Sequence, residues 1–414
     1  MSEQIDVAII GAGLAGLSCA KELKRNNIDF HIFESTDSVG GRVKTDNIDG
    51  YLLDRGFQLY NPSYSEGKKV LDYEKLNLKS FTPGVAIRDK NRLRVITDPF
   101  RSTEYKYNFI TQMPGSLREK IGLLSYFLKY LIQSDAQIAI SKDISSLDAL
   151  SKSKINKNLL NKLLRPFLQG VFLESELATS RKFLDIVLKT FLQGTPSVPE
   201  KGMQQIPLQL AESIGIENIT FNSRVEKITE NSIFTNNKEI KARKIVVASD
   251  PIQAISWLNL PIKKMNSVST WYFKANQEVA NLLKSLPILF VDADNSGPLT
   301  NAVVLTNASK FYAPQNEVLV SASSIYPFEQ SSTEEIKNHC AKLFGVDTKD
   351  WELIKKYEIK DALPQMKPPF TLIDSNKVTE NLFVCGDHRA TSSINGAFLS
   401  GRNTATSVKV SLGL

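Results

Sequence analysis

The first 34 residues constrain the fold of this chain more than any other segment. The apolar run Ile5–Ile10 predicts a buried parallel strand, and a glycine-rich turn leads from it into a predicted helix that starts near Leu14. A second apolar run, Phe30–Phe33, ends in Glu34. A strand, a glycine turn, a helix and a second strand in this order are typical of a doubly wound α/β sheet. The sequence therefore predicts a Rossmann-like α/β domain at its start.

The glycine turn and the acidic strand end together indicate a dinucleotide site. The candidate binding residues of the turn are Gly11, Gly13, Leu14, Ala15 and Gly16. The first glycine permits the tight turn, the second lets the backbone approach a pyrophosphate, and the third allows close packing of helix on strand. The helix N-terminus offers free N–H groups and its dipole to the phosphates. Glu34 is placed to accept hydrogen bonds from a ribose diol and would repel the 2′-phosphate of NADP.

The next segment distinguishes FAD from NAD. In Gly40-Gly41-Arg42 two glycines free the backbone for close contact, and the arginine adds a fork of donors. With this segment the chain resembles the superfamily of flavin amine oxidases and phytoene desaturases, whose N-terminal signature is GxGxxG, an acidic strand end and GGR. The resemblance implies a Rossmann-like FAD-binding domain interleaved with an α+β substrate domain. None of the three cysteines stands where the covalently flavinylated amine oxidases attach their cofactor, which implies noncovalent FAD.

Residues 53–58 (LDRGFQ) resemble the family's DxGxH segment, which lies against the flavin. The resemblance makes Gly56, Phe57 and Gln58 candidate cofactor contacts, beside Gly41 and Arg42. Because Gln58 stands where a histidine is common, no histidine-based chemistry is carried over to it.

Two later segments complete the resemblance. Residues 382–385 predict a short buried strand that ends in Gly386 and Asp387, and the family's closing motif follows. The resemblance implies that Asp387 hydrogen-bonds the ribityl or pyrophosphate region. It also implies that the backbone around Ile394 and Ala397, at a helix N-terminus, stabilises negative charge on the flavin. Residues 219–228 resemble the strand whose Val225 backbone contacts the adenine in relatives, although the pattern alone fits an ordinary strand equally well.

Length and composition agree with a two-domain enzyme. The 414 residues exceed one typical core. We place the FAD-binding domain at residues 1–95, 196–250 and 366–414, and the substrate domain at 96–195 and 251–365.

The net charge of +7 comes from scattered lysines, and this pattern does not indicate nucleic-acid binding. The three cysteines show no metal or redox spacing, and with no leader before the first strand the sequence predicts a cytoplasmic protein.

One segment leaves two interpretations open. Residues 121–132 (IGLLSYFLKYLI) follow a capping box of Ser116 and Glu119 and carry only a narrow polar stripe. Such a helix fits the core of the substrate domain. It also fits a peripheral membrane contact through residues 116–133, or an apolar substrate entrance.

The reaction is inferred from positions at which this chain differs from the monoamine oxidases of the family. Monoamine oxidases have a tyrosine of their amine-binding cage where this chain has Ser393, and Leu363-Pro364 looks more like the desaturase segment. These features favour hydride transfer to flavin N5 from an apolar isoprenoid, polyene or tetrapyrrole-like substrate, with oxygen or a quinone as acceptor. The alternatives are an amine oxidase that releases hydrogen peroxide, a flavin-dependent cis–trans isomerase and an inactive FAD-binding scaffold. No catalytic residue and no metal site is predicted, and His388 beside Asp387 is the one histidine near the expected cofactor.

Overall fold

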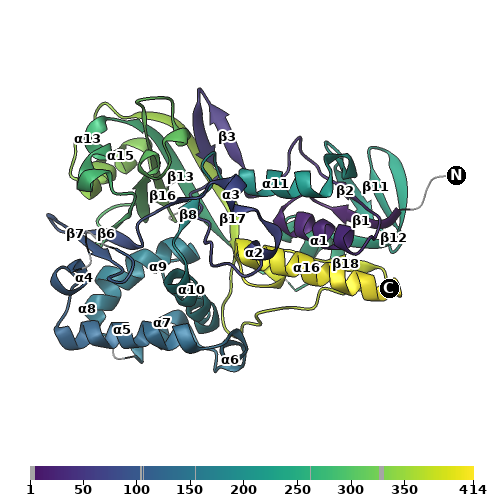
Figure 1. The fold of residues 1–414 in the computed structure, drawn as a ribbon, viewed down its shortest axis with the longest axis horizontal. Helices are drawn as coiled ribbons and strands as arrows, with labels where there is room; N and C mark the ends of the chain where they lie inside the picture. The colour runs from purple at the N-terminus through teal and green to yellow at the C-terminus, as the bar shows by residue number, and fades with distance from the viewer. Residues whose placement is uncertain (1–4, 103–104, 106, 154, 262, 326–330) are drawn as a thin grey trace.

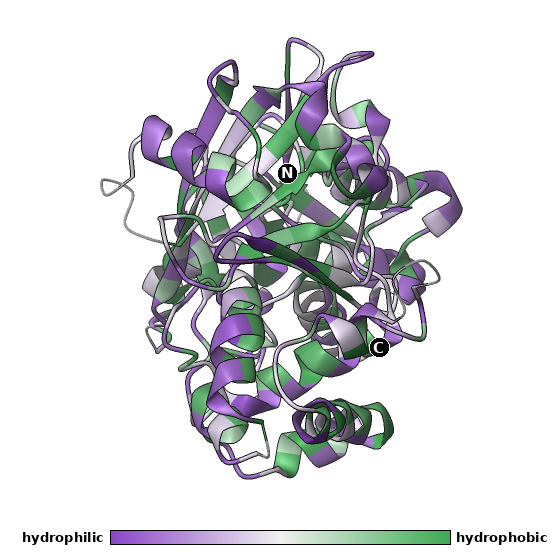
Figure 2. Cartoon of the chain, turned by 90° about the vertical axis from the view of Figure 1, so that its left-hand side faces the viewer, coloured by the Kyte–Doolittle hydropathy of each residue, from purple (hydrophilic) through white to green (hydrophobic). Residues whose placement is uncertain are grey.

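The computed structural model of the chain describes residues 5–102, 105, 107–153, 155–261, 263–325 and 331–414. Two sheets organise the molecule, one in each half of Figure 1, and a layer of helices lies below the second sheet. Figure 2 shows hydrophobic residues concentrated in the interior strands, and purple hydrophilic residues on much of the surrounding helices. The α/β fold class predicted from the sequence is confirmed by this arrangement.

The first sheet has a parallel centre and an antiparallel edge. Its order is β10-β11-β12-β1-β2-β9, and β18 pairs with the second half of β12. Its strands are β1 (Ile5–Ile10), β2 (Phe30–Phe33), β9 (Ile219–Thr220), β10 (Val225–Ile228), β11 (Ser232–Thr235), β12 (Lys238–Val247) and β18 (Leu382–Val384). The pairs made by β1, and the pairs β2 with β9 and β12 with β18, are parallel. The carboxyl ends of four strands, β1, β2, β12 and β18, therefore meet at one edge.

Three helices pack on this sheet, α1 (Leu14–Arg25), α11 (Gln205–Ile214) and α16 (Ile394–Ser411). The first and last of them touch closely. Ser18 Oγ donates to the Phe398 carbonyl at 2.9 Å, and a Cβ on Gly401 would lie 2.2 Å from the Ala15 carbonyl oxygen. Because α1 and α16 approach at small residues, the two ends of the chain share one hydrophobic core.

The second sheet is antiparallel except for the pair β14 with β6. Its order is β17-β13-β16-β15-β14-β6-β7. The strands are β6 (Gly84–Asp89), β7 (Arg92–Thr97), β13 (Met265–Ala275), β14 (Leu289–Asp292), β15 (Asn301–Val304), β16 (Val318–Ser324) and β17 (Glu352–Pro364). Helix α15 (Thr333–Phe344) packs on it through buried Ile336, Cys340 and Leu343.

The helical layer contains α4 (Asn108–Thr111), α5 (Leu117–Ile132), α6 (Asp135–Ile140), α7 (Ser146–Ser151), α8 (Lys157–Leu159), a π-helix (Leu160–Leu164), α9 (Arg165–Phe172) and α10 (Arg181–Gln193). Short elements between the two sheets in the sequence are β3 (Thr45–Ile48), β4 (Tyr51–Asp54), α2 (Gly67–Val70), α3 (Tyr73–Leu76), β5 (Lys79–Ser80), β8 (Ser197–Val198) and α12 (Pro251–Leu258). Two further short helices, α13 (Gln277–Ala280) and α14 (Leu305–Ala308), join strands of the second sheet. Turns of 3₁₀-helix lie at Ile216–Asn218, Leu282–Ser285, Lys310–Tyr312 and Asp387–Arg389.

The structure corrects one expectation about a single element. Residues 219–228 form two strands rather than one, because the chain turns through Asn222, whose φ is +50°, and β9 and β10 then pair with different partners. Pro166 lies at the start of α9, which follows the π-helix without a break. Proline has no N–H to donate to the preceding turn, and the chain is wound as a π-helix just before it.

Sheet membership bears on where the domains divide. Strands β6 and β7 belong to the second sheet, whereas the sequence-based division kept residues up to 95 with the cofactor domain. The sheet partners were not visible in the sequence because β6 pairs with β14, about two hundred residues later. The other pieces of the division, 196–250 and 366–414, hold β9–β12 and β18 of the first sheet.

Candidate functional site

One continuous cavity runs from the edge of the first sheet to the helical layer, with a volume of about 1210 Å³. It starts where β1, β2, β12 and β18 end. Every site residue predicted from the sequence lines it except Gly16: these are Gly11, Gly13, Leu14, Ala15, Glu34, Gly41, Arg42, Gly56, Phe57, Gln58, Val225, Gly386, Asp387, Ile394 and Ala397. The fold thus brings segments from the beginning, middle and end of the chain into one site.

The glycine turn after β1 leaves room for a ligand against the backbone. Gly11 has a φ of +105°, and a Cβ there would lie 2.7 Å from the Ala248 carbonyl oxygen. A Cβ on Gly13 would meet nothing within 4 Å, so this side of the turn faces open cavity. Gly16 faces inward, where a Cβ would lie 2.1 Å from the Gly11 carbonyl oxygen. These three environments fit a turn, a pyrophosphate approach and helix packing in that order.

Glu34 is held by the backbone that surrounds it. Its Oε2 accepts from the Ala12 N–H at 2.8 Å, and its Oε1 accepts from the Thr36 N–H at 2.9 Å and the Thr36 hydroxyl at 2.8 Å. Only 6% of the residue is exposed, and the carboxylate lines the cavity. A carboxylate oriented in this way can accept further hydrogen bonds from a ribose diol.

Arg42 of the N-terminal motif and Asp387 of the C-terminal motif are in direct contact. Arg42 Nη2 donates to Asp387 Oδ1 at 2.5 Å, and Arg42 Nη1 donates to the Ala362 carbonyl at 2.9 Å. Burial opposes the charge on the guanidinium, but the neighbouring Asp387 carboxylate raises the pKa of Arg42. The pair lines the cavity beside the glycine turn, where a cation and an acceptor can hold a phosphate and a hydroxyl.

Gln58 presents an unused acceptor to the cavity. Its Nε2 donates to the carbonyls of Arg42 at 2.9 Å and Arg55 at 3.3 Å, which fixes the orientation of the amide. Its Oε1 is buried and has no hydrogen-bond partner among the described residues. An orphaned buried acceptor is costly unless an occupant of the cavity supplies a donor, as an N–H of a flavin would.

The N-terminus of α16 also faces the cavity. Ser393 caps this helix, because its hydroxyl accepts from the Gly396 N–H at 3.0 Å. Ile394 and Ala397, in the first turn, line the cavity with Asp387. A helix N-terminus at this place favours negative charge on a bound group.

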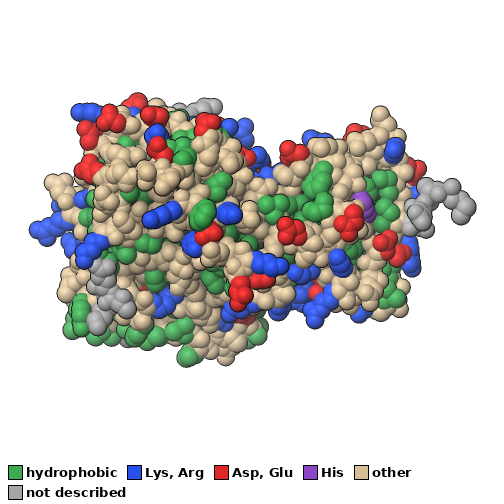
Figure 3. Space-filling model, turned by 45° about the horizontal axis from the view of Figure 1, so that its top comes forward, with side chains coloured by type: hydrophobic (Ala, Val, Ile, Leu, Met, Phe, Trp, Pro, Cys, Tyr) green, Lys and Arg blue, Asp and Glu red, His purple; other side chains and the backbone are tan. Residues whose placement is uncertain are grey.

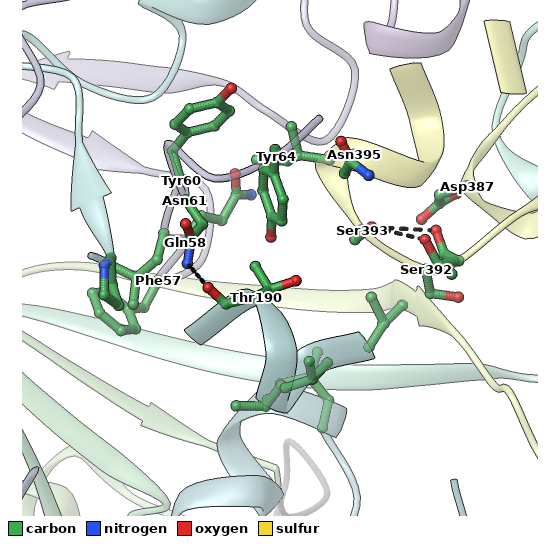
Figure 4. Close-up of a pocket in the computed structure, with 18 of the residues that line it drawn as sticks. Phe57, Gln58, Tyr60, Asn61, Tyr64, Thr190, Asp387, Ser392, Ser393 and Asn395 are labelled. Carbon is green, nitrogen blue, oxygen red and sulfur yellow. Dashed lines mark hydrogen bonds between the residues drawn. The ribbon is translucent and has the colours of Figure 1, made fainter. Parts of the chain in front are cut away.

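The part of the cavity away from the sheet is apolar. Its walls include Phe109, Leu124, Phe127, Leu163, Phe167 and Val187. Figure 4 shows a few polar residues around the cavity near Asp387, among them Asn61, Tyr64, Thr190 and Asn395. Burial raises the pKa of Tyr64 to about 12, so its hydroxyl stays protonated and can donate to an occupant.

Few ionisable or nucleophilic groups face the apolar part. The carboxylates that line the whole cavity are Glu34, Asp98, Asp250 and Asp387. Asp98 pairs with Arg101 at 2.8 Å, and the other three lie near the sheet edge. The cysteines and histidines of the described chain do not line the cavity. No group of acidic, histidine or cysteine side chains in the described residues could hold a metal ion.

The sequence reasoning missed several cavity residues. Ala248, Ser249 and Asp250 follow β12 at the same edge as Gly11 and Glu34. The apolar run before them, residues 245–248, was a usable signal for a parallel strand. Tyr60 and Tyr64 had no such signal, because a loop brings them to the cavity.

Comparisons with known proteins agree with this geometry. The family model for flavin containing amine oxidoreductase matches residues 14–409. Coproporphyrinogen III oxidase of Staphylococcus aureus is 29% identical over 182 residues, which cover 40% of this chain and 36% of that protein. The 4,4′-diapophytoene desaturase of the same species is 25% identical over 265 residues, or 57% and 52% of the two chains. This chain thus spans about a third to a half of the length of these curated relatives. A putrescine oxidase double mutant shares the fold, with a TM-score of 0.73, 17% identity and coverage of 98% and 99%.

Proposed function

We propose, from the premise that this chain belongs to the flavin-containing amine oxidoreductase family, that it binds FAD noncovalently and oxidises an apolar substrate. The observation that carries the proposal is a single cavity with two chemically different ends. The end at the sheet edge has the backbone, carboxylate and guanidinium groups that fit a dinucleotide. The other end has aliphatic and aromatic walls.

The residues at the sheet edge fit FAD. Gly13 lets the pyrophosphate approach the backbone, Glu34 accepts from the ribose, and Arg42 with Asp387 orients the groups between them. The N-terminus of α16 stabilises negative charge on the ring system. Bound flavin supplies a hydride acceptor, which the side chains of this cavity lack. The absence of cysteine and histidine side chains from the described cavity wall supports noncovalent binding.

The apolar end selects and positions the substrate. Its walls exclude water and remove apolar surface of the substrate from solvent, which favours binding by about 25 cal/mol per Å². The Tyr64 hydroxyl is a donor in an otherwise apolar environment and can orient one polar group of the substrate. A cavity of about 1210 Å³ exceeds the common range for one small ligand, as expected where cofactor and substrate lie together.

Amine oxidation is the second candidate, because the family and a solved fold neighbour carry that chemistry in their names. A charged amine needs a carboxylate or an aromatic cage around its nitrogen. The carboxylates of the described cavity wall lie at the sheet edge or in the Asp98–Arg101 pair, and Ser393 occupies the position at which the resemblance would place a cage tyrosine. Both features favour the apolar substrate.

Anaerobic reduction of the bound flavin tests the proposal. The holoenzyme would be mixed in separate cuvettes with diapophytoene in detergent, with coproporphyrinogen III and with putrescine, and flavin absorbance would be followed. Bleaching by either of the first two compounds, and not by the amine, is the expected result. Bleaching by putrescine alone would establish an amine oxidase. No bleaching by a broad panel of apolar compounds would contradict net oxidation.

A cavity variant separates substrate from cofactor in this assay. Leu124→Trp adds bulk to the apolar wall, away from Glu34 and Arg42. It should slow bleaching by the substrate while flavin occupancy stays unchanged. The control variant is Val410→Trp, at an exposed position near the end of α16. If it slows bleaching as much as Leu124→Trp does, the slowing does not arise from the apolar wall of the cavity.

A further inference from the structure

Helix α5 exposes an apolar face to solvent. Leu117, Ile121, Leu128 and Ile132 are 63%, 55%, 44% and 87% exposed. Their spacings of four, seven and four residues place them along one side of the helix. The buried residues of α5 are Leu123 and Tyr130, on another side. Helix α5 therefore contributes one face to the core of the helical layer, as the first interpretation expected, and leaves the opposite face exposed.

Neighbouring segments extend this apolar face into a patch. Phe100, Ile110 and Ile140 are 77%, 55% and 87% exposed. We call these three residues and the four exposed residues of α5 the α5 patch. Figure 3 shows hydrophobic side chains gathered along the lower edge of the left-hand lobe, the side on which Figure 1 places α5. Exposed apolar residues are ordinary when scattered, whereas a contiguous group marks an interaction surface.

The segment that carries the α5 patch is rich in basic residues. Residues 100–165 carry eleven Lys and Arg against five Asp and Glu, an excess of six within a chain whose net charge is +7. Arg118, Lys129, Lys142, Lys152 and Lys157 are exposed, and none forms an ion pair with the described carboxylates. On α5 itself, Arg118 and Lys129 lie beside the apolar face. Such side chains can lie along an apolar surface and place their charges in a layer of lipid headgroups.

The cavity opens at the same place. Leu128 and Phe100 of the α5 patch line the cavity, and so does Leu131 of α5, which is 38% exposed. Leu124 and Phe127, on the inner side of α5, continue the apolar wall inward. One helix thus forms both the exposed patch and the entrance of the cavity.

We propose that the α5 patch docks this protein on an anionic lipid surface, with α5 lying in the plane of the interface. No helix in the described part of the chain has the length and apolarity needed to cross a bilayer. The excess of positive charge in residues 100–165, with Arg118 and Lys129 beside the apolar face, favours an anionic lipid surface as the partner. The entrance at Leu128 then receives apolar molecules directly from the lipid; this second step rests on the proposed function, whereas docking does not.

Vesicle flotation with the flavin-loaded protein tests docking without any turnover. The probes are vesicles of phosphatidylcholine alone and of phosphatidylcholine with phosphatidylglycerol. We expect binding to the second kind only, weakened by salt. The variant Ile121→Ser/Ile132→Ser should bind at least about tenfold more weakly, because each side chain loses its apolar contact. Arg118→Gln/Lys129→Gln should lose roughly fivefold per charge.

Val410→Ser is the matched control, since Val410 is 71% exposed in α16, outside the patch. It should bind vesicles as the unchanged protein does. Failure of the unchanged protein to float, or equal binding by the Ile121/Ile132 variant, would overturn the proposal. Concentration-dependent dimerisation that the serine variant abolishes, without vesicle binding, would overturn it in favour of a second copy. Flavin reduction in detergent would remain unaffected in each case, which separates this test from that of the proposed function.

Discussion

Arg42 donates a hydrogen bond to Asp387 across 2.5 Å, although 345 residues separate them in the chain. The two residues belong to the N-terminal and C-terminal motifs that the sequence pointed to separately. Their contact fixes the loop after β2 against the end of β18. The pair thus holds the N-terminal and C-terminal segments of the cavity wall together near the sheet edge.

Breaking this pair should weaken flavin binding through both residues together. Arg42→Met and Asp387→Asn should each lower flavin affinity, and the double variant should lose less than the sum of the two. We expect a coupling energy of roughly 1 kcal/mol, because the Arg42 side chain is 35% exposed and partly screened by water. Flavin titration of the apoproteins measures it, and strictly additive losses would contradict the coupling.

Gly13 and Gly16 should respond to valine in opposite ways. Gly13→Val should fold normally but bind no flavin, since its new side chain enters open cavity where the pyrophosphate is expected. Gly16→Val should lower the free energy of unfolding by at least about 1–3 kcal/mol, because the side chain collides with the Gly11 carbonyl. Thermal unfolding and flavin content distinguish the two outcomes. A flavin-replete Gly13→Val protein would remove the pyrophosphate assignment.

Glu34→Ala should weaken flavin binding by about 1–3 kcal/mol, because the ribose loses its acceptor and the Ala12 N–H loses its partner. Glu34→Gln keeps the volume but has one acceptor oxygen in place of two, so an intermediate loss is expected. The dissociation constant of FAD from each variant provides the measurement. Unchanged affinity in the alanine variant would show that Glu34 does not bind the cofactor.

His388 should make stability depend on pH. Burial lowers its pKa to about 4, and neither ring nitrogen has a hydrogen-bond partner among the described residues. The unfolded chain takes up a proton near pH 6.5, whereas the folded protein does so only near pH 4. The folded state should therefore lose up to about 3 kcal/mol of stability from this group as the pH falls through this window.

The variant His388→Leu isolates this effect. Burial raises the pKa of Asp54 and of Asp185 to about 6, and these groups change stability with the opposite sign over an overlapping range. The difference between His388→Leu and the unchanged protein cancels their contribution. That difference should favour the variant increasingly below pH 6.5, as measured by chemical unfolding at several pH values. A difference that does not vary with pH would contradict a neutral buried His388.

The local elements of the cofactor end were predictable because each depends on nearby residues. The strands β1 and β2 and the start of α1 are where the periodicity placed them. Gly11 and Gly13 line the cavity, as the glycine spacing predicted, because the geometry of the turn is set within six residues. The family and the flavin fold were also identified correctly from these motifs.

Features that depend on distant partners were not predictable. The thirteen residues of β17 carry mostly polar or charged side chains, so no apolar alternation marked this edge strand, which pairs with β13. The assignment of β6 to the second sheet depends on β14. Whether α5 was buried depended on what packs against it, and its apolar sequence fitted both a core helix and an interfacial helix.

The close packing of α1 against α16 also sets the order in which the protein can fold during synthesis. Strand β1 gains its neighbour β12 only after residues 242–247 have been made, and Ser18 gains its partner only when Phe398 has left the ribosome. Contacts between residues so far apart in the sequence form slowly. The strand edges stay exposed until these contacts have formed. The nascent chain therefore carries an incomplete cofactor pocket until Asp387 and helix α16 have emerged, and the complete site for flavin forms only then.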